Sequence, residues 1–129
     1  MTGAGEALVE AAATALHGVA GIGRVYDAPP LQASVPYALV EADLVTDWGH
    51  KSGAGREVRL AALLHDQGER PVRLRALASA AETALERLTG DVGGGWRLVS
   101  MRLLRTRIVR TRSGGWTAAI EFRARLLAA

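Results

Sequence analysis

The amino-acid sequence predicts an α+β fold, namely a mainly antiparallel sheet of four to five strands with two helices packed on one of its faces. Two segments repeat apolar residues every three or four positions, as helices do, and several others alternate apolar and polar residues, as strands do. Segments rich in glycine and proline separate them. The 129 residues show no internal repeat and no domain boundary, so we expect a single domain over residues 1–129.

The first helix is expected over residues 5–17. Its apolar positions recur with a helical spacing, and they are Leu8, Ala12, Ala15 and Leu16. Glu6 and Glu10 stand in its first turns, where a negative charge interacts favourably with the helix dipole. Three glycines between residues 18 and 23 then provide turn positions, and a short extended piece over residues 24–27 stops before Pro29.

Residues 37–48 and 56–65 are expected to form an antiparallel pair of strands, joined by a flexible polar loop over residues 49–55 that projects at the tip. In the first strand, alternation predicts one buried face. The positions expected on that face are Ala38, Val40, Ala42 and Leu44, and those on the opposite face are Leu39, Glu41 and Asp43. The buried positions of the second strand are expected to be Val58, Leu60, Ala62 and Leu64.

Residues 71–89 are expected to form the second helix, which is the clearest element of the sequence. One apolar stripe runs along it and consists of Leu74, Leu77, Ala78, Ala81, Leu85 and Leu88. Pro71 suits the first turn of a helix, and Gly90 marks its end.

A long strand over residues 96–111 changes the parity of its apolar residues along its length. Val99, Met101 and Leu103 share one parity, and Leu104, Thr106 and Ile108 continue on the other. We expect a β-bulge near Leu103 and Leu104, because one extra residue exchanges the two faces. A turn over residues 112–115 leads to the last strand, whose inward positions are expected to be Trp116, Ala118, Ile120, Phe122, Ala124 and Leu126.

The net charge of +3 hides a strong asymmetry along the chain. Residues 1–55 carry two basic residues against six acidic ones, whereas residues 97–129 carry eight arginines against Glu121 alone. Such asymmetry suggests a surface that meets charged partners or other copies of the same chain. The first ten residues lack the basic stretch of a secretion signal, and no apolar run is long enough to cross a bilayer, so we expect neither secretion nor membrane insertion.

No pattern in the sequence predicts catalysis, a metal or a cofactor. The chain has no cysteine, its three histidines lack metal-ligand spacing, and no serine lies in a nucleophile elbow. The glycines of residues 18–23 follow a helix and precede a strand, which reverses the context of a phosphate loop. Glu41, Asp43 and Asp47 could hold a divalent ion, but a solvated or interface face is the favoured interpretation.

The basic stretch of residues 97–112 offers an alternative function as a nucleic-acid-binding module. Trp96 and Trp116 flank it as possible stacking groups. Trp116, however, has the inward parity of the last strand, and six aromatic residues are few for a stacking platform. An oligomer interface or a solvated face is therefore favoured over sequence-independent contact with nucleic acid.

The order of several short motifs resembles the tail-completion or tail-terminator family of long-tailed phages and gene transfer agents. These motifs are the run from Val25 to Pro30, Pro36-Tyr37 with Glu41, Asp47-Trp48, the strand opening at Gly55, the helix of residues 71–88, and the closing Gly-Gly-Trp hairpin that ends in Phe122-Arg123-Ala124-Arg125. The resemblance spans nearly the whole chain. The doubled Pro29-Pro30 and the Ala38-Leu39-Val40 run depart from the family pattern and leave the local loop geometry open.

The resemblance implies a non-enzymatic virion protein, assembled in the bacterial cytoplasm and located in the tail or neck region of a phage or gene transfer agent particle. Such subunits form a homo-oligomeric, hexameric ring that caps the head-proximal end of the tail tube. The implied partners are the tail tube protein and the head-tail stopper or connector, and DNA passes through the lumen.

Three groups of residues are candidates for these contacts. The interface or DNA-lumen candidates are Arg97, Arg102, Arg105, Arg107, Arg110, Arg112, Arg123 and Arg125. The partner-contact loop is represented by His50, Lys51, Ser52 and Arg56, and the acidic complementary patch by Glu41, Asp43 and Asp47. Complementary charge on two patches of one subunit suits a ring, whose contacts join different patches of neighbouring copies.

Overall fold

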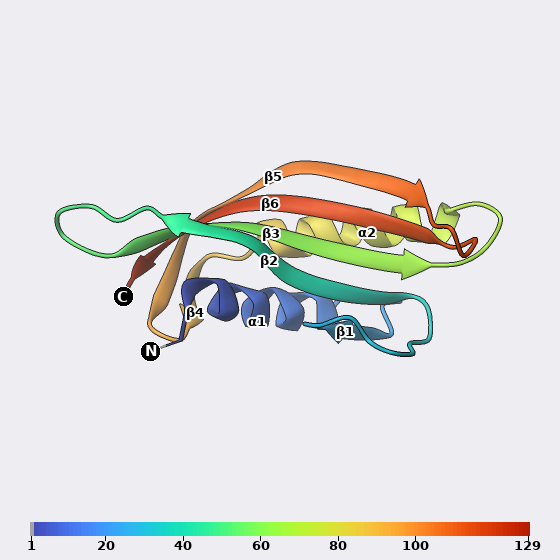
Figure 1. The fold of residues 1–129 in the computed structure, drawn as a ribbon, viewed down its shortest axis with the longest axis horizontal. Helices are drawn as coiled ribbons and strands as arrows, with labels where there is room; N and C mark the ends of the chain where they lie inside the picture. The colour runs from blue at the N-terminus through green and yellow to red at the C-terminus, as the bar shows by residue number, and fades with distance from the viewer. Residues whose placement is uncertain (1) are drawn as a thin grey trace.

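The computed structural model describes residues 2–129 and contains two helices and six strands (Figure 1). The elements in chain order are α1 (Ala4–His17), β1 (Arg24–Tyr26), β2 (Tyr37–Asp47), β3 (Gly55–Asp66), α2 (Val72–Glu86), β4 (Gly90–Gly93), β5 (Trp96–Arg110) and β6 (Trp116–Ala128). The α+β class and both helices are thus as predicted. None of the helices within residues 2–129 has the length and apolar character needed to span a bilayer.

The predicted sheet was wrong in strand number and in direction. The six strands form one mixed sheet in the order β1-β2-β3-β6-β5-β4, and β1 runs parallel to β2. All other neighbours are antiparallel. The strand β4 escaped prediction because glycine, at both of its ends, is disfavoured in strands and reads as a turn. Its pairing with the start of β5 overrides that local preference.

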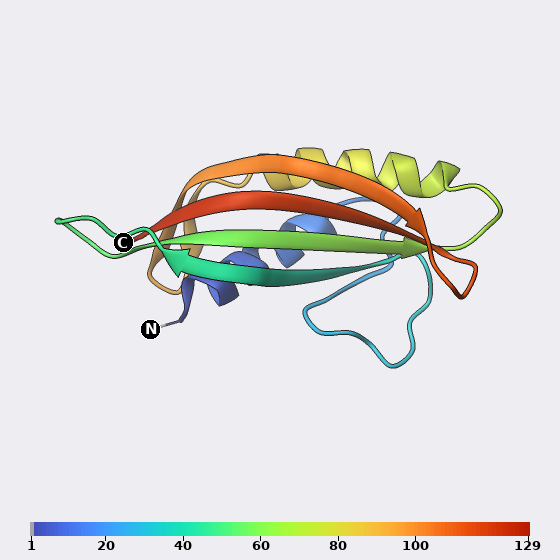
Figure 2. The ribbon, with the colours of Figure 1, turned by 45° about the horizontal axis from the view of Figure 1, so that its top comes forward.

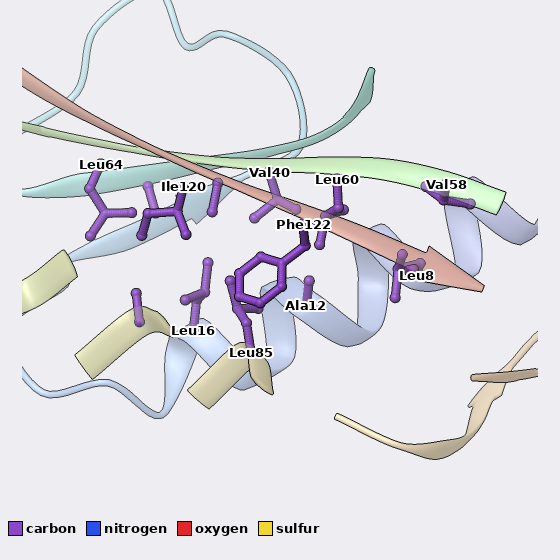
Figure 3. Close-up of a cluster of buried hydrophobic side chains, with 14 of the residues drawn as sticks. Leu8, Ala12, Leu16, Val40, Val58, Leu60, Leu64, Leu85, Ile120 and Phe122 are labelled. Carbon is purple, nitrogen blue, oxygen red and sulfur yellow. The ribbon is translucent and has the colours of Figure 1, made fainter. Parts of the chain in front are cut away.

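Both helices pack against the same face of the sheet and leave the other face uncovered (Figure 2). Phe122 of β6 is fully buried and lies between the helices and the strands, next to Leu16 of α1 and Leu85 of α2 (Figure 3). The predicted apolar stripe of the second helix is confirmed, with Leu74, Leu77, Ala78, Ala81 and Leu85 buried. All the predicted inward residues of the last strand except Trp116 are buried as well.

Three bulges shift the register of the two long strands that flank the central pair. The expected bulge near Leu104 is confirmed, because the pairing of β5 with β6 slips between Leu103 and Arg105. Two bulges were not predicted, one at Asp43 in β2 and one at Val99 in β5. The first corrects an expected core position, since Leu44 is 56% exposed, and the second leaves Val99 37% exposed although it shares the parity of Met101 and Leu103. In each case one extra residue moves the side chain out of the buried set.

Candidate functional site

The uncovered face of the sheet carries a row of three arginines directly opposite one another on neighbouring strands. Arg59 of β3 pairs with Arg123 of β6, and Arg123 pairs in turn with Arg102 of β5. Like charges in directly opposed positions repel one another. Arg59 and Arg102 are exposed, and within residues 2–129 none of the three forms an ion pair. The row therefore presents concentrated positive charge at the middle of this face.

Arg123, at the centre of the row, has an unusual environment. Its Nε atom is buried and has no hydrogen-bond partner among the described residues. A buried donor left without a partner costs free energy, typically about 1–3 kcal/mol. A partner group that accepted a hydrogen bond from this Nε would therefore stabilise the face relative to the isolated subunit.

The rows on either side are neutralised by carboxylates. Arg105 donates two hydrogen bonds to Glu121, at 2.7 and 3.2 Å, and Arg125 donates one to Glu57 at 3.1 Å. The Arg105 hydrogen bond, aided by the charges of Arg105, Arg107 and Arg59, holds the pKa of Glu121 below its usual value. The same contact raises the pKa of Arg105. On this face, the arginines without a carboxylate partner among the described residues are thus those of the middle row, together with Arg97 and Arg107 on β5.

The other arginines of the predicted basic set do not share one surface. Arg97 and Arg107 lie on the uncovered face of β5, opposite Leu127 and Ala119 of β6. Arg110 lies at the end of β5 on the opposite parity and stacks over the Trp116 ring at 4.5 Å. Arg112 lies in the turn before β6 and is exposed.

The three residues of the predicted acidic patch lie along one strand but are not clustered. Glu41 faces the uncovered side opposite Ala61, and Asp43 is the extra residue of the β2 bulge. Asp47 accepts hydrogen bonds from Arg56 at 3.1 Å and from the Gly49 amide at 3.3 Å, at the far end of the strand. Consistent with this spread, no group of acidic or histidine side chains within residues 2–129 is arranged to hold a metal ion.

A pocket of about 210 Å³ lies between the bulges of β2 and β5. Its lining includes Asp43 and Leu44 from β2, Arg59 from β3, Glu121 from β6 and Leu104 from β5. Leu44 and Leu104 are 56% and 39% exposed. The bulges thus place apolar side chains beside the arginine row, which is the composition of a protein contact rather than of a solvated face.

The loop between β2 and β3 projects from one end of the molecule (Figure 1). It is a bonded hairpin tip, because His50 and Gly53 exchange both backbone hydrogen bonds, at 3.0 and 3.1 Å. The Ser52 amide donates to Nδ1 of His50 at 3.3 Å, and Lys51 is exposed. At its base, Arg56 is half-buried and bonded to Asp47. The predicted contact loop therefore has a defined shape in the isolated subunit.

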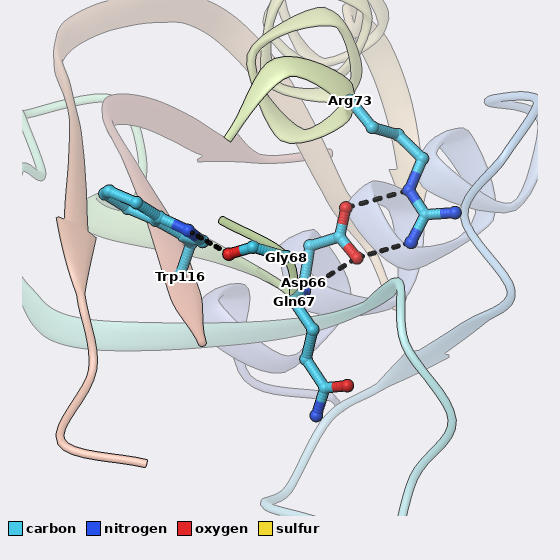
Figure 4. A network of polar contacts seen from close by, with 5 residues as sticks. All are labelled: Asp66, Gln67, Gly68, Arg73 and Trp116. Carbon is cyan, nitrogen blue, oxygen red and sulfur yellow. Dashed lines mark hydrogen bonds and ion pairs between the residues drawn. The ribbon is translucent and has the colours of Figure 1, made fainter. Parts of the chain in front are cut away.

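The opposite end of the sheet carries an ion pair between a buried carboxylate and an exposed arginine. Asp66, at the end of β3, accepts two hydrogen bonds from Arg73 of α2, at 2.8 and 2.5 Å, and one from the Gln67 amide (Figure 4). The Arg73 hydrogen bond is the main cause that lowers the pKa of Asp66. Trp116 donates to the Gly68 carbonyl at 3.0 Å. These contacts fix the turn between β3 and α2.

Beside this ion pair, a pocket of about 200 Å³ contains the polar groups most similar to an active site. His65 stacks on the ring of Tyr37, and its Nδ1 lies 2.9 Å from the hydroxyl of Thr117. Burial lowers the pKa of His65. Asp66, the neighbouring carboxylate in the sequence, is bonded to Arg73, and within residues 2–129 the only side-chain hydrogen bond of His65 is the one with Thr117.

The two tryptophans considered for base stacking, Trp96 and Trp116, and also Trp48, make contacts within the subunit. Trp96 is 5% exposed, and its Nε1 donates to the Thr2 carbonyl at 2.7 Å. The Trp116 ring is covered by Arg110, and the Trp48 ring lies 5.2 Å from the guanidinium of Arg125. The rings therefore do not form an open platform.

The residue that sequence reasoning left out of the site is Arg59. Alternation places it on the outer face of its strand, but its importance lies in its position opposite Arg123 and Arg102. That position depends on the order β3-β6-β5 and on the register of pairing. The one usable signal was an arginine on the uncovered face of a strand expected to be central.

Comparison with known proteins identifies relatives over nearly the whole chain. The family described as tail completion protein gp17 matches residues 6–127. A solved chain in a structure described as "Virion of native gene transfer agent (GTA) particle" is 28% identical, with a TM-score of 0.71. The match covers 90% of this chain and 84% of that one. No curated protein sequence matches the chain.

Proposed function

The chain belongs to the tail completion protein gp17 family, and from that premise we propose that it is a tail terminator, a structural protein of a phage or gene transfer agent particle. In this role, copies of the subunit form a hexameric ring at the head-proximal end of the tail tube. The ring ends the tube and joins it to the stopper or connector of the head, and DNA passes through its lumen. The role needs no catalysis.

The observation that carries the proposal is the family match over residues 6–127, which includes α2 and five strands whole, α1 without its first two residues and β6 without its last. The similarity in fold to a chain of a gene transfer agent virion supports it independently. Both matches extend over nearly all of the chain, so they concern the whole subunit and not one motif.

The surface of the subunit has features that contact with neighbouring subunits would stabilise. One face of the sheet carries the Arg59–Arg123–Arg102 row and the exposed Leu44 and Leu104 beside it. Such a face gains stability when an acidic and apolar partner covers it, because the arginines then find carboxylates. The bonded hairpin tip at residues 50–53 extends from one end and offers a preformed contact for the tube or the connector.

The proposal is tested by locating the protein in purified particles. Particles made with a tagged copy are examined by electron microscopy and mass spectrometry, and we expect the tag at the junction of head and tail. Deletion of the gene should leave heads and tails unjoined. Particles that contain no copy of the protein would overturn the proposal.

One observation favours a second candidate, a basic module that binds nucleic acid. The arginines of the middle row have no carboxylate partner among the described residues, and phosphate groups would supply one. This candidate predicts that the purified protein binds duplex DNA with an affinity that falls steeply as salt rises. If no binding is detected at low salt, it is rejected, and the tail-terminator proposal is unaffected.

A further inference from the structure

The sheet has two long edges whose backbone groups lack a neighbouring strand. β1 covers only Tyr37–Leu39 of β2, and β4 covers only Trp96–Leu98 of β5. Within residues 2–129, no strand pairs with the outer edges of residues 40–47 or 99–110. A free edge of this length presents a row of amide and carbonyl groups ready to pair with another strand.

The two free edges carry opposite charge. β2 contains Glu41, Asp43 and Asp47 and no basic residue, whereas β5 contains five arginines and no acidic residue. Most of the charge asymmetry between the two ends of the sequence is therefore displayed at opposite edges of one sheet. Oppositely charged side chains on adjacent antiparallel strands stabilise their pairing.

The two edges also match in strand direction and in height, that is, in their position along the strand axis. Three antiparallel pairings separate β2 from β5, so these two strands run in opposite directions. Rotation about an axis along the strands would place β5 of one copy antiparallel to β2 of the next. Following the pairing across the sheet puts Glu41 on the row of Arg105 and Thr46 on the row of Ser100, so the free segments lie at the same height.

We propose that the partner of each free edge is a second copy of this chain, with the β2 edge of one subunit paired to the β5 edge of the next. This pairing joins the sheets of successive subunits into one continuous sheet around the ring, and it rests on the tail-terminator role proposed above. Pairing between two β5 edges would oppose arginine to arginine, and pairing between two β2 edges would oppose acid to acid. Charge thus selects the head-to-tail arrangement that a closed ring requires.

The bulges restrict where the ladder forms. Two of them interrupt the edges at neighbouring positions along the strands, at Asp43 in β2 and at Leu104 in β5, and the third, at Val99, lies where the free edge of β5 begins. Bonded pairs are therefore expected in two short stretches, one on each side of the bulges. Because strands in a closed barrel tilt, the exact partners are offset along the edges, and the experiment scans several positions.

The absence of native cysteine makes disulfide cross-linking a direct test. Thr46→Cys is combined in turn with Ser100→Cys, Arg102→Cys, Arg107→Cys or Val109→Cys, four positions on the uncovered face of β5. Particles carrying each double variant are oxidised and separated on a non-reducing gel. We expect at least one combination to produce a ladder of covalent multimers, and the single variants to remain monomeric.

The outcomes separate this inference from the proposed function. If the protein is absent from particles, the tail-terminator role fails. If it is present but no combination cross-links, edge pairing is overturned while the role stands. Dimers from a single β5 cysteine would show that two β5 edges meet, which also overturns the inference.

A charge exchange provides a second, independent test. One variant carries Glu41→Lys and Asp43→Lys, and the other carries Arg102→Glu and Arg107→Glu, which leaves the Arg105–Glu121 pair intact. In cells that lack the native gene, we expect each variant alone to reduce joined particles at least tenfold. Together they should restore joining, because alternating copies again set acidic edges against basic ones. Efficient joining by either variant alone, or no recovery with both when each has the wild-type melting temperature, would overturn the inference.

Discussion

The two faces of β6 differ in burial and in how fully their polar groups are paired, although their residues alternate along one strand. Ile120, Phe122 and Ala124 are fully buried under the helices. Between them, Glu121 and Arg123 lie on the uncovered face, where the buried Nε of Arg123 has no hydrogen-bond partner among residues 2–129. The covered face is complete within the subunit, whereas the uncovered face contains unsatisfied charge. One side of this strand therefore stabilises the fold, and the other is left free for contacts outside the subunit.

The contrast predicts its largest effect at the centre of the covered face. Phe122→Ala removes a fully buried ring that contacts both layers, and we expect it to lower the free energy of unfolding by about 3–5 kcal/mol. Urea denaturation followed by circular dichroism measures the change. Thr117→Ala on the uncovered side of the same strand, which removes the hydroxyl contact with His65 but no buried ring, is the comparison variant and should lose far less stability. A Phe122 variant as stable as the wild type would show that the helices do not depend on this contact.

An intermediate effect is expected at the pair of Asp66 and Arg73, whose carboxylate is buried and whose arginine is exposed, which extends the comparison to charged groups. Asp66 is 4% exposed, and Asp66→Asn removes the carboxylate that Arg73 contacts, so we expect a loss of about 1–3 kcal/mol. The matched control is Asp47→Asn, whose side chain is 82% exposed, with an expected change below about 0.5 kcal/mol. Equal losses of stability in the two variants would contradict a larger contribution from Asp66 than from Asp47.

The same pair predicts a dependence on pH. Because the folded pKa of Asp66 is lowered, its contribution is present above the ordinary carboxyl pKa and is lost as pH falls through the folded value. The difference in stability between wild type and Asp66→Asn should therefore shrink below about pH 4. Thermal melting at a series of pH values measures it.

The smallest effect is expected on the uncovered face, and it has the opposite sign. Arg102→Gln relieves repulsion within the arginine row, so the isolated subunit should become more stable by about 0.2–1 kcal/mol. Salt should reduce the difference because it screens exposed charges. Arg105→Gln, which loses the contact with Glu121, should not gain stability. Destabilisation by Arg102→Gln in low salt would show that the row is satisfied without a partner.

Local patterns correctly predicted the elements in which one side is buried along the whole length. The stripe from Leu74 to Leu85 and the alternation from Ala118 to Leu126 were read correctly, because each has one buried side. The parity change at Leu104 revealed its bulge for the same reason. The Asp43 bulge left no such trace, since Ala42 and Leu44 are both apolar and appeared to continue the buried face. β4 was missed because its pairing outweighs its glycine-rich composition.

The candidate surface was predictable in charge but not in arrangement. Arg102 and Arg123 were both identified from the sequence, yet only the strand order brings them opposite each other and adds Arg59. The acidic residues of β2 were read as a patch, whereas Glu41 and Asp47 lie far apart along the strand. Cross-strand register depends on contacts between distant segments, which periodicity within one segment does not record.

The bulges at Asp43 and Leu104 also bear on how chain length can change during evolution. Each is a single residue added to a strand that otherwise alternates correctly, since Ala42 and Leu44 on one strand, and Leu103 and Arg105 on the other, face opposite sides. Loss of one codon at either position would straighten the strand without reversing any side chain beyond it. Outside these two positions and the third bulge at Val99 of β5, the same deletion would turn the interior outward. The bulge sites are therefore where natural length variation is expected to be tolerated.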